Sequence, residues 1–189
     1  MTNSVSDPVD DLLVMQAQDG DRRSMEALVR RWQKRLWTYA HRLTGRSEVA
    51  WDITQQTWVA IIKGLHRLHD PAKFKAWAYR IVANKAIDHL KSRAPGAAGS
   101  ESADESRPPR QESRVILRDL LRRLEPGQQA LLVLYYFEGL TVAEIGFVLG
   151  IPPGTVKSRL HASRAELRRL WERNAAENGN ERRRHQEDH

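Results

Sequence analysis

The sequence predicts an all-α protein with two small helical domains joined by a flexible linker. Apolar residues recur at three- and four-residue steps along most of the 189-residue chain, and no stretch alternates as a strand does. Residues 94–113 interrupt this pattern, because they are rich in Gly, Pro, Ser and charge and contain no aliphatic residue larger than Ala. We therefore expect domains at residues 10–93 and 114–173, with the linker at 94–113 and a disordered tail at 174–189.

The first domain is expected to hold four helices. Gly45 interrupts the pattern after the second helix, and Ser47 is a candidate N-cap for the third, which runs to about Leu65. Asp70 and Pro71 predict a loop before a long helix at about residues 72–92. The apolar positions that define the first three helices are Leu12, Leu13 and Met15; Met25, Leu28, Val29, Trp32, Leu36 and Tyr39; and Val49, Ile53, Trp58, Ile61 and Ile62.

The second domain is expected to contain helices at about residues 114–124 and 128–137, followed by a helix-turn-helix. Thr141 and Glu144 have the spacing of a capping box directly before an apolar run. Gly146 is expected where the two helices of this motif cross, which is a position that requires a very small side chain. Its propensity cost relative to Ala is about 1 kcal/mol, and close packing at a crossing offsets that cost.

Gly150 is expected to end the first helix of the motif, and Pro152 and Pro153 suit the turn and the first position of the next helix. This next helix separates an apolar side from a basic side. Its inward side is expected to contain Val156, Leu160, Ser163, Leu167, Leu170 and Trp171. Its outward side contains Thr155, Lys157, Ser158, Arg159, His161, Ala162 and Arg164. Such a helix can enter the major groove of DNA, with side chains near its N-terminus reading base edges.

The distribution of charge fits a polyanionic partner. The formal net charge is +7, from 31 Lys and Arg against 24 Asp and Glu. Residues 8–93 hold 16 of the basic and 9 of the acidic residues, and residues 114–173 hold 10 and 6, so two basic blocks flank an acidic linker. Phosphate neutralisation with counterion release favours nucleic-acid binding by such surfaces. Charge alone fits a helical hairpin with a solvated basic face as well. The capping box, crossing glycine and turn together favour DNA binding.

The composition excludes several classes of site. The chain has no cysteine, which rules out disulfides and thiolate metal sites. No apolar run approaches the roughly 18 residues that a membrane-spanning helix needs. The N-terminal residues are acidic and polar, unlike a secretory signal peptide. These features predict a cytoplasmic protein without membrane insertion.

Several segments resemble extracytoplasmic-function (ECF) sigma factors of the sigma-70 family. The stretch "LEPGQQALLVLYYFEGLTVAEIGFVLGIPPGTVKSRLHASRAELRRL" resembles their region 4. In the first domain, "AQDGDRRSMEALVRRW" resembles region 2.1, "WDITQQTW" region 2.2, and "FKAWAYRIVANKAIDHLK" regions 2.3 and 2.4. The likeness covers about residues 10–173, with both halves in the family's order. It implies a factor without catalysis of its own, which binds core RNA polymerase and directs promoter-specific transcription initiation through the −10 and −35 elements.

The resemblance also implies partners for each domain. Region 2 is expected to bind the β′ clamp helices of core polymerase, and region 4 the β flap. In the 2.2 helix, Asp52, Gln55 and Gln56 are the expected polymerase contacts, whereas Trp58 and Ile61 fit the core at least as well. Many relatives are held inactive by an anti-sigma factor, so such an inhibitor is a further partner hypothesis, for which the sequence shows no site. No cofactor is implied.

Regions 2.3 and 2.4 imply recognition and opening of the −10 element. Residues 73–93 contain six Lys and Arg and one acid, interleaved with aromatic and amide side chains. Extruded bases need such π-faces, polar edges and cations. The loop at residues 66–73 matches the segment that cradles a flipped base in relatives, and Trp77 fits either a wedge against the duplex or the core. The expected −10 contacts are Lys73, Trp77, Arg80, Asn84, Lys85 and Asp88.

The expected −35 contacts, carried over from the family's region 4 motif, are Thr155, Lys157, Ser158, Arg159, His161 and Arg164. Three positions depart from the family's pattern. Gln56 replaces the usual Glu of region 2.2, and Trp51 stands where an acid is common. Ala162 occupies the place of an Arg that commonly contacts −35 DNA, so the promoter sequence cannot be taken from relatives.

Two other functions stay open at this stage. A stand-alone helix-turn-helix transcriptional regulator explains residues 114–173 but gives "WDITQQTW" and residues 73–93 no role. An enzyme is not supported, because the sequence has no P-loop, no Gly-rich nucleotide fingerprint and no metal-ligand cluster. His66 and His69 are expected to be solvated loop histidines rather than a metal pair.

Overall fold

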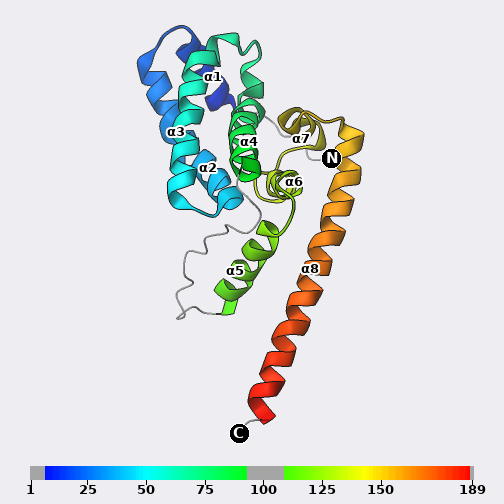
Figure 1. The fold of residues 1–189 in the computed structure, drawn as a ribbon. Helices are drawn as coiled ribbons and strands as arrows, with labels where there is room; N and C mark the ends of the chain where they lie inside the picture. Colours follow the sequence, from blue (N-terminus) through cyan, green and yellow to red (C-terminus); the bar gives the residue numbers. More distant parts are fainter. Residues whose placement is uncertain (1–6, 93–108, 188–189) are drawn as a thin grey trace.

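The computed structural model describes residues 7–92 and 109–187, with side chains for residues 7–92 and 115–176. Every regular element within these ranges is helical, which confirms the predicted all-α class (Figure 1). The elements are α1 (Pro8–Gln18), α2 (Arg22–Thr44), α3 (Ser47–Gly64), the short 3₁₀ helices η1 (Leu65–Arg67) and η2 (Pro71–Lys73), α4 (Phe74–Ser92), α5 (Pro109–Arg122), α6 (Pro126–Tyr136), α7 (Val142–Leu149) and α8 (Pro153–Glu187).

Helices α1 to α4 form the first unit around an aromatic core. Trp32 and Tyr39 of α2 and Phe74 and Tyr79 of α4 are buried there. The Trp32 ring lies edge-on to Phe74 at 5.4 Å between centroids, and Tyr39 lies edge-on to Tyr79 at 5.2 Å. Edge-to-face pairs of this kind add about 0.5–1.5 kcal/mol beyond the burial of their area. The aromatic side chains therefore hold α4 against α2.

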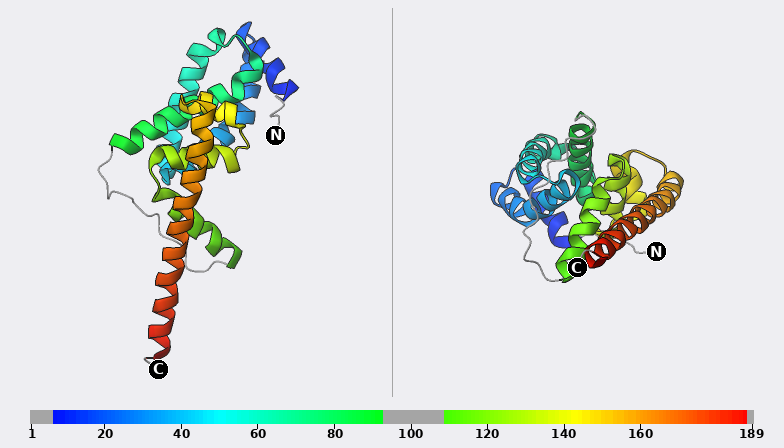
Figure 2. Two further views of the ribbon diagram at one scale, coloured as in Figure 1. Left: turned by 90° about the vertical axis from the view of Figure 1, so that its right-hand side faces the viewer. Right: turned by 60° about the horizontal axis from the view of Figure 1, so that its bottom comes forward.

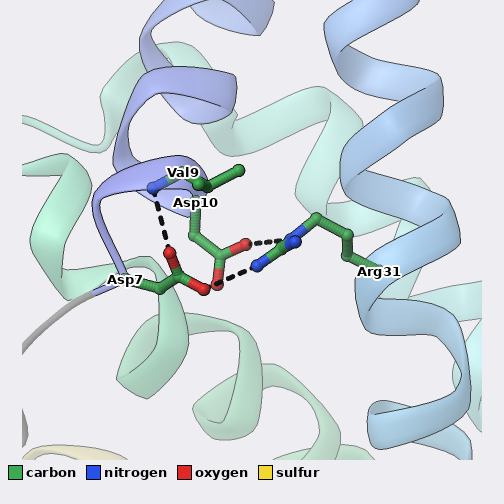
Figure 3. A network of polar contacts seen from close by, with 4 residues as sticks. All are labelled: Asp7, Val9, Asp10 and Arg31. Carbon is green, nitrogen blue, oxygen red and sulfur yellow. Dashed lines mark hydrogen bonds and ion pairs between the residues drawn. The ribbon is translucent and has the colours of Figure 1, made fainter.

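Helix α1 is attached to α2 by a charged network (Figure 3). Arg31 of α2 donates to Asp10 at 2.7 Å and to Asp7 at 2.6 Å. Asp7 also accepts from the Val9 backbone N–H at 3.0 Å, so the same carboxylate caps α1. This pairing turns Asp10 and Val14 inward and leaves Leu12 and Met15 exposed, although the sequence pattern counted both among the apolar positions.

The connection between α2 and α3 differs from the prediction. Gly45 ends α2 in the left-handed conformation, at φ 71°, as its place in the sequence suggested. The extended residue before α3 is Arg46, which is the N-cap and makes no side-chain capping bond. Ser47 is the first residue of α3 instead of its cap. The cap position falls on Arg46 because only one residue separates the glycine from the next helix.

The second unit confirms the predicted helix-turn-helix. Glu144 N–H donates to Thr141 Oγ1 at 3.2 Å, and Thr141 N–H donates to Glu144 Oε2 at 2.7 Å, so the capping box is complete. Gly150 ends α7 at φ 66°. A Cβ atom on Gly146 would lie 2.8 Å from the Ile151 carbonyl oxygen, closer than real Cβ contacts. Gly146 therefore needs a very small side chain because it packs against the backbone of the turn between α7 and α8.

Three features of the second unit differ from the sequence prediction. Helix α5 begins at Pro109 instead of near residue 114. Helix α8 continues to Glu187 past the predicted start of a disordered tail at residue 174, and it projects beyond the other helices (Figure 2). The tail contains three Glu and three Arg and no proline, which allows an existing helix to continue. Trp171 is 46% exposed because Leu170 occupies the inward position at that turn.

Replacing Gly146 by Ala tests the close approach at the turn. We expect Gly146→Ala to destabilise the second unit by about 1–3 kcal/mol, because its methyl group overpacks against backbone that cannot move aside freely. Gly154→Ala is the matched control, since a Cβ there meets nothing within 4 Å. Urea unfolding followed by circular dichroism measures both variants. Equal stability of the two would show that residue 146 does not require glycine.

Candidate nucleic-acid interface

The first part of α8 presents a basic surface on the second unit. Val156, Leu160 and Ser163 are buried on its inward side, as predicted. Thr155 is half-buried, and the other expected −35 residues are exposed: Lys157, Ser158, Arg159, His161 and Arg164. Ala162 is exposed among them, so the position of the family's usual Arg lies on the outward side. The orientation predicted from the spacing of the apolar residues is confirmed.

Few internal contacts hold these outward side chains. Ser158 Oγ donates to the Thr155 carbonyl at 3.1 Å, and Arg164 Nε donates to the Leu160 carbonyl at 3.1 Å. Within the described residues, Lys157 and Arg159 form no ion pair. Both cations therefore keep their charge available for a polyanion.

Helix α4 and the preceding loop carry a second group of basic and polar side chains. Asn84 and Asp88 are exposed, and Lys85 is half-buried. Lys73 forms an ion pair with Asp70 at 3.3 Å, and Asp70 Oδ1 also accepts from the Ala72 backbone N–H at 3.1 Å. The loop is therefore ordered by its own carboxylate, and the Lys73 ammonium lies at the start of α4.

Two expected −10 residues are partly engaged within the protein. Trp77 is half-buried, and its ring lies against the end of α3, 3.2 Å from where a Cβ of Gly64 would stand. Its centroid is 6.3 Å from that of Phe74. The Arg80 guanidinium lies 4.9 Å from the centroid of the Phe147 ring, which belongs to α7. Trp77 is therefore partly buried against the core of the first unit, and Arg80 contacts Phe147 of the second unit.

Helix α3 carries a third surface, which mixes polar and apolar side chains. Asp52, Gln55 and Gln56 are exposed, whereas Trp58 and Ile61 are buried, as the core interpretation predicted. Gln56 Oε1 accepts from Lys85 Nζ at 3.4 Å, so this surface adjoins the polar side of α4. Three large apolar residues that were not among the predicted contacts share the α3 face: Trp51, Val59 and Ile62.

A signal in the sequence could have identified two of these residues. Trp58 is followed directly by Val59, and Ile61 directly by Ile62. Adjacent residues on a helix lie about 100° apart, so when Trp58 and Ile61 point into the core, Val59 and Ile62 are turned from it toward solvent. Trp51 is held in place by Trp37, at 5.7 Å between centroids, and Trp37 stacks on His41 at 4.9 Å. The stacked rings of Trp51, Trp37 and His41 thus lie along one edge of the exposed α3 face.

No metal site and no membrane span are present within the described ranges. No group of three or more His, Cys, Asp or Glu side chains in this part of the chain is arranged to hold a metal ion. His66 is exposed and accepts from Arg67 Nε at 3.3 Å, and His69 is exposed as well. Among the helices described, none is long and apolar enough to cross a bilayer.

Comparison with known proteins places both units in one family. Residues 28–95 match the family model of Sigma-70 region 2, and residues 114–167 match that of Sigma-70, region 4. The ECF RNA polymerase sigma factor SigL of Mycobacterium tuberculosis is 34% identical over 144 residues, which span 70% of this chain and 80% of SigL. The ECF RNA polymerase sigma factor SigE of Mycolicibacterium smegmatis is 31% identical over 172 residues, which span 84% of this chain and 66% of SigE.

A solved structure agrees with these matches. CnrH, determined in complex with the cytosolic domain of CnrY, superposes with a TM-score of 0.69 at 29% identity, covering 87% of this chain and 97% of the CnrH chain. A stand-alone helix-turn-helix regulator is not favoured, because the region 2 match covers residues outside the helix-turn-helix. The chain belongs to the ECF sigma factors of the sigma-70 family, and its function is to direct RNA polymerase to promoters.

Proposed function

We propose that three exposed surfaces have separate roles in promoter-specific initiation. The outward side of α8 reads the −35 element, α4 with residues 66–73 binds the −10 element, and the α3 face binds the β′ clamp helices of core polymerase. Region 4 makes a further contact with the β flap. The catalytic chemistry belongs to the polymerase, and this chain supplies specificity and positioning.

The observation that carries this proposal is the presence of two separate basic surfaces on one chain. A repressor needs only the groove-reading helix that α8 provides. Helix α4 adds cations, one amide (Asn84) and an aromatic ring on a second unit, and its Lys85 donates to Gln56 of α3. This combination suits a protein that must hold unstacked bases while it is bound to a large partner.

The −35 surface is proposed to act through Thr155, Lys157, Ser158, Arg159, His161 and Arg164. Lys157 and Arg159 have no competing ion pair in the described chain, so they can bind phosphates or base edges. Arg164 already donates to the carbonyl of Leu160, which leaves its terminal nitrogens for phosphate. Ala162 offers no donor, and its neighbours must therefore supply the base contacts.

The polymerase surface is proposed to combine a polar and an apolar half. Asp52, Gln55 and Gln56 provide an acid and two amides. Val59 and Ile62 are 52% and 56% exposed, and they continue the same side of α3. An exposed apolar group with a polar border is typical of a protein-binding surface. With Gln56 in place of the usual Glu, the apolar half is expected to contribute a larger share of the affinity.

We also infer an inhibitory protein partner. CnrH, a structural relative at 29% identity, is known in complex with the cytosolic domain of CnrY, which supports the idea that a second protein binds this chain. Co-purification of the full chain from its native cells tests this partner. Recovery with polymerase subunits alone would argue against it.

Run-off transcription tests the function as a whole. We expect the chain with core polymerase to initiate at specific sites on fragmented genomic DNA, whereas core polymerase alone does not. A stand-alone regulator would instead bind an operator tightly without polymerase, and an electrophoretic shift with the free chain distinguishes the two. Unchanged initiation on every fragment, with and without the chain, would disprove the proposal.

Ala162→Arg tests the register of the −35 surface. We expect the variant to bind −35 DNA about tenfold more tightly or to prefer a different −35 sequence, because a well-placed Arg–base pair contributes about 1–3 kcal/mol. Ala175→Arg is the matched control, since residue 175 is also exposed on α8 but lies far beyond the recognition segment. Selection of bound sequences from a randomised −35 library measures both. Identical affinity and sequence preference for wild type and Ala162→Arg would place the groove-facing side elsewhere.

Asp52→Arg tests the polymerase surface. Reversal of this charge is expected to weaken binding to core polymerase by at least about tenfold, because like charges across an interface are strongly unfavourable. Glu26→Arg makes the same change in charge on α2, where Glu26 is exposed and forms an ion pair with Arg22 of its own helix. Fluorescence anisotropy of labelled chain titrated with core polymerase gives both affinities. Equal affinities for the two variants would remove Asp52 from the interface.

A further inference from the structure

A glutamine at the end of α1 holds the start of the loop that is proposed to bind the −10 element. Gln18 Nε2 donates to the Leu65 carbonyl at 2.9 Å and to the Leu68 carbonyl at 2.7 Å. The two acceptors lie 47 and 50 residues further along the chain. Gln18 is half-buried and is not one of the expected DNA or polymerase contacts. Its hydrogen bonds therefore need an explanation other than direct recognition.

The chain at this point needs donors from outside its own helix. Leu65 begins η1, and the backbone becomes extended at Leu68, with φ −80° and ψ 97°. The Leu65 carbonyl also accepts from the Leu68 backbone N–H at 3.0 Å. The Leu68 carbonyl lies where the helix has ended, so no following turn supplies a donor to it. Gln18 bonds to both carbonyls and thereby fixes the spacing between the two ends of η1.

A primary amide is the side chain that suits two carbonyl acceptors. Its NH₂ group carries two hydrogens, so one nitrogen can donate to both oxygens of the loop. A Glu of the same length would place a charged acceptor against two further acceptors, and a Met would offer no donor. The position of Gln18 therefore depends on the chemistry of its end group as well as on its length.

The far end of the loop is fixed by a different side chain. Asp70 Oδ1 accepts from the Ala72 backbone N–H at 3.1 Å, and Asp70 Oδ2 pairs with Lys73 at 3.3 Å. Between the bonds of Gln18 and those of Asp70, three polar side chains are exposed: His66, Arg67 and His69. The backbone that carries these side chains is thus held at its start by α1 and at its end by its own carboxylate.

Helix α1 is itself well anchored beside the loop. It packs against both η1 and η2, and Asp10 near its start pairs with Arg31 of α2 at 2.7 Å. After its end, Asp21 caps α2 by accepting from the N–H groups of Arg23 and Ser24, both at 3.1 Å. The Ser24 hydroxyl, followed by the Arg23 N–H, lowers the pKa of Asp21, so this cap is ionised at neutral pH. Both ends of α1 are therefore fixed to α2.

We propose that Gln18 is a positioning residue for −10 recognition, and that it holds the loop at residues 66–73 in the shape that receives an unstacked base. This inference rests on the proposed role of the loop in −10 binding. Gln18 needs no contact with DNA for this role, because its amide is engaged with the backbone of the loop. A loop that is ordered before binding loses less conformational entropy when the base arrives, which favours binding.

Backbone relaxation measured by NMR tests the ordering of the loop without polymerase or promoter. Gln18→Met keeps an unbranched side chain of similar length and removes both donors. We expect the order parameters of residues 66–69 to fall in this variant from about 0.85, typical of rigid backbone, to below about 0.6. Gln16→Met is the matched control, since Gln16 lies on the same helix and bonds to Ser24 of α2 at 2.7 Å. Rigid order parameters in Gln18→Met would overturn the proposal.

The same measurement separates a local effect from a loss of the fold. We expect α2 and α4 to keep their wild-type order parameters in both variants, because their buried residues do not depend on the loop. A fall that extends through α2 and α4 in Gln18→Met would show that Gln18 stabilises the whole unit, and it would overturn a specific role at the loop.

Selection of single-stranded DNA tests whether the ordered loop reads a base. The probe is a library of single-stranded oligonucleotides with randomised −10 positions, selected by the full chain bound to core polymerase. We expect Gln18→Met to lose about tenfold of the preference at one position, that of the base received by the loop, because one wrong contact to a base costs about this much. The positions read by α4 should keep their preference. Gln16→Met should match the wild type at every position.

The pattern of loss distinguishes positioning from general stability. Weaker binding by Gln18→Met with unchanged preferences at all positions would show that Gln18 only stabilises the protein, and would overturn its role in recognition. The same loss in Gln16→Met would assign the effect to α1 as a whole and would also overturn it. Absence of any preference in the wild type and both variants would instead disprove the proposed −10 function, and the relaxation result would stand independently.

Discussion

A helix at the surface buries one side and exposes the other, and this geometric limit determines where the proposed contact residues of α3 and α8 lie. Helix α3 buries Ile53, Trp58 and Ile61 and must leave Asp52 and Gln55 exposed. Helix α8 follows the same rule at its start, where burial of the apolar residues turns the cations outward. The proposed binding surfaces are thus consequences of core packing, because a residue that contributes to the core fixes the direction of its neighbours.

Close packing at the helix-turn-helix adds a second constraint. The capping box of Thr141 and Glu144 fixes the start of α7, and Gly150 fixes its end. Between them, Gly146 lets the turn approach so closely that any side chain would meet backbone. The direction in which α8 leaves the turn therefore depends on backbone geometry, and the turn fixes the orientation of the proposed −35 surface.

The two units share one buried interface, which combines apolar and polar groups. Helix α6 buries six consecutive residues, Gln129 to Leu134, and packs against both α2 and α4. Polar groups meet at the same interface, where Glu138 accepts from Arg42 Nη1 at 2.5 Å and Gln129 Nε2 donates to the Arg42 carbonyl at 3.0 Å. Apolar burial and hydrogen bonds together therefore hold the second unit against the first.

Local patterns in the sequence determined the helical class, the turn at Gly150, the capping box and the outward position of Lys157 and Ala162. Each depends on residues within two turns of helix, so spacing is sufficient to predict it. Other features required the tertiary structure. Exposure of Leu12 and Met15 follows from the pairing of Asp10 with Arg31, 21 residues away. Burial of Glu138 follows from Arg42, 96 residues away, and no local pattern marks it as different from a surface acid. The sequence determined which side of each helix is apolar, and the tertiary structure decided which charges meet, because partners distant in the chain are brought together only by packing.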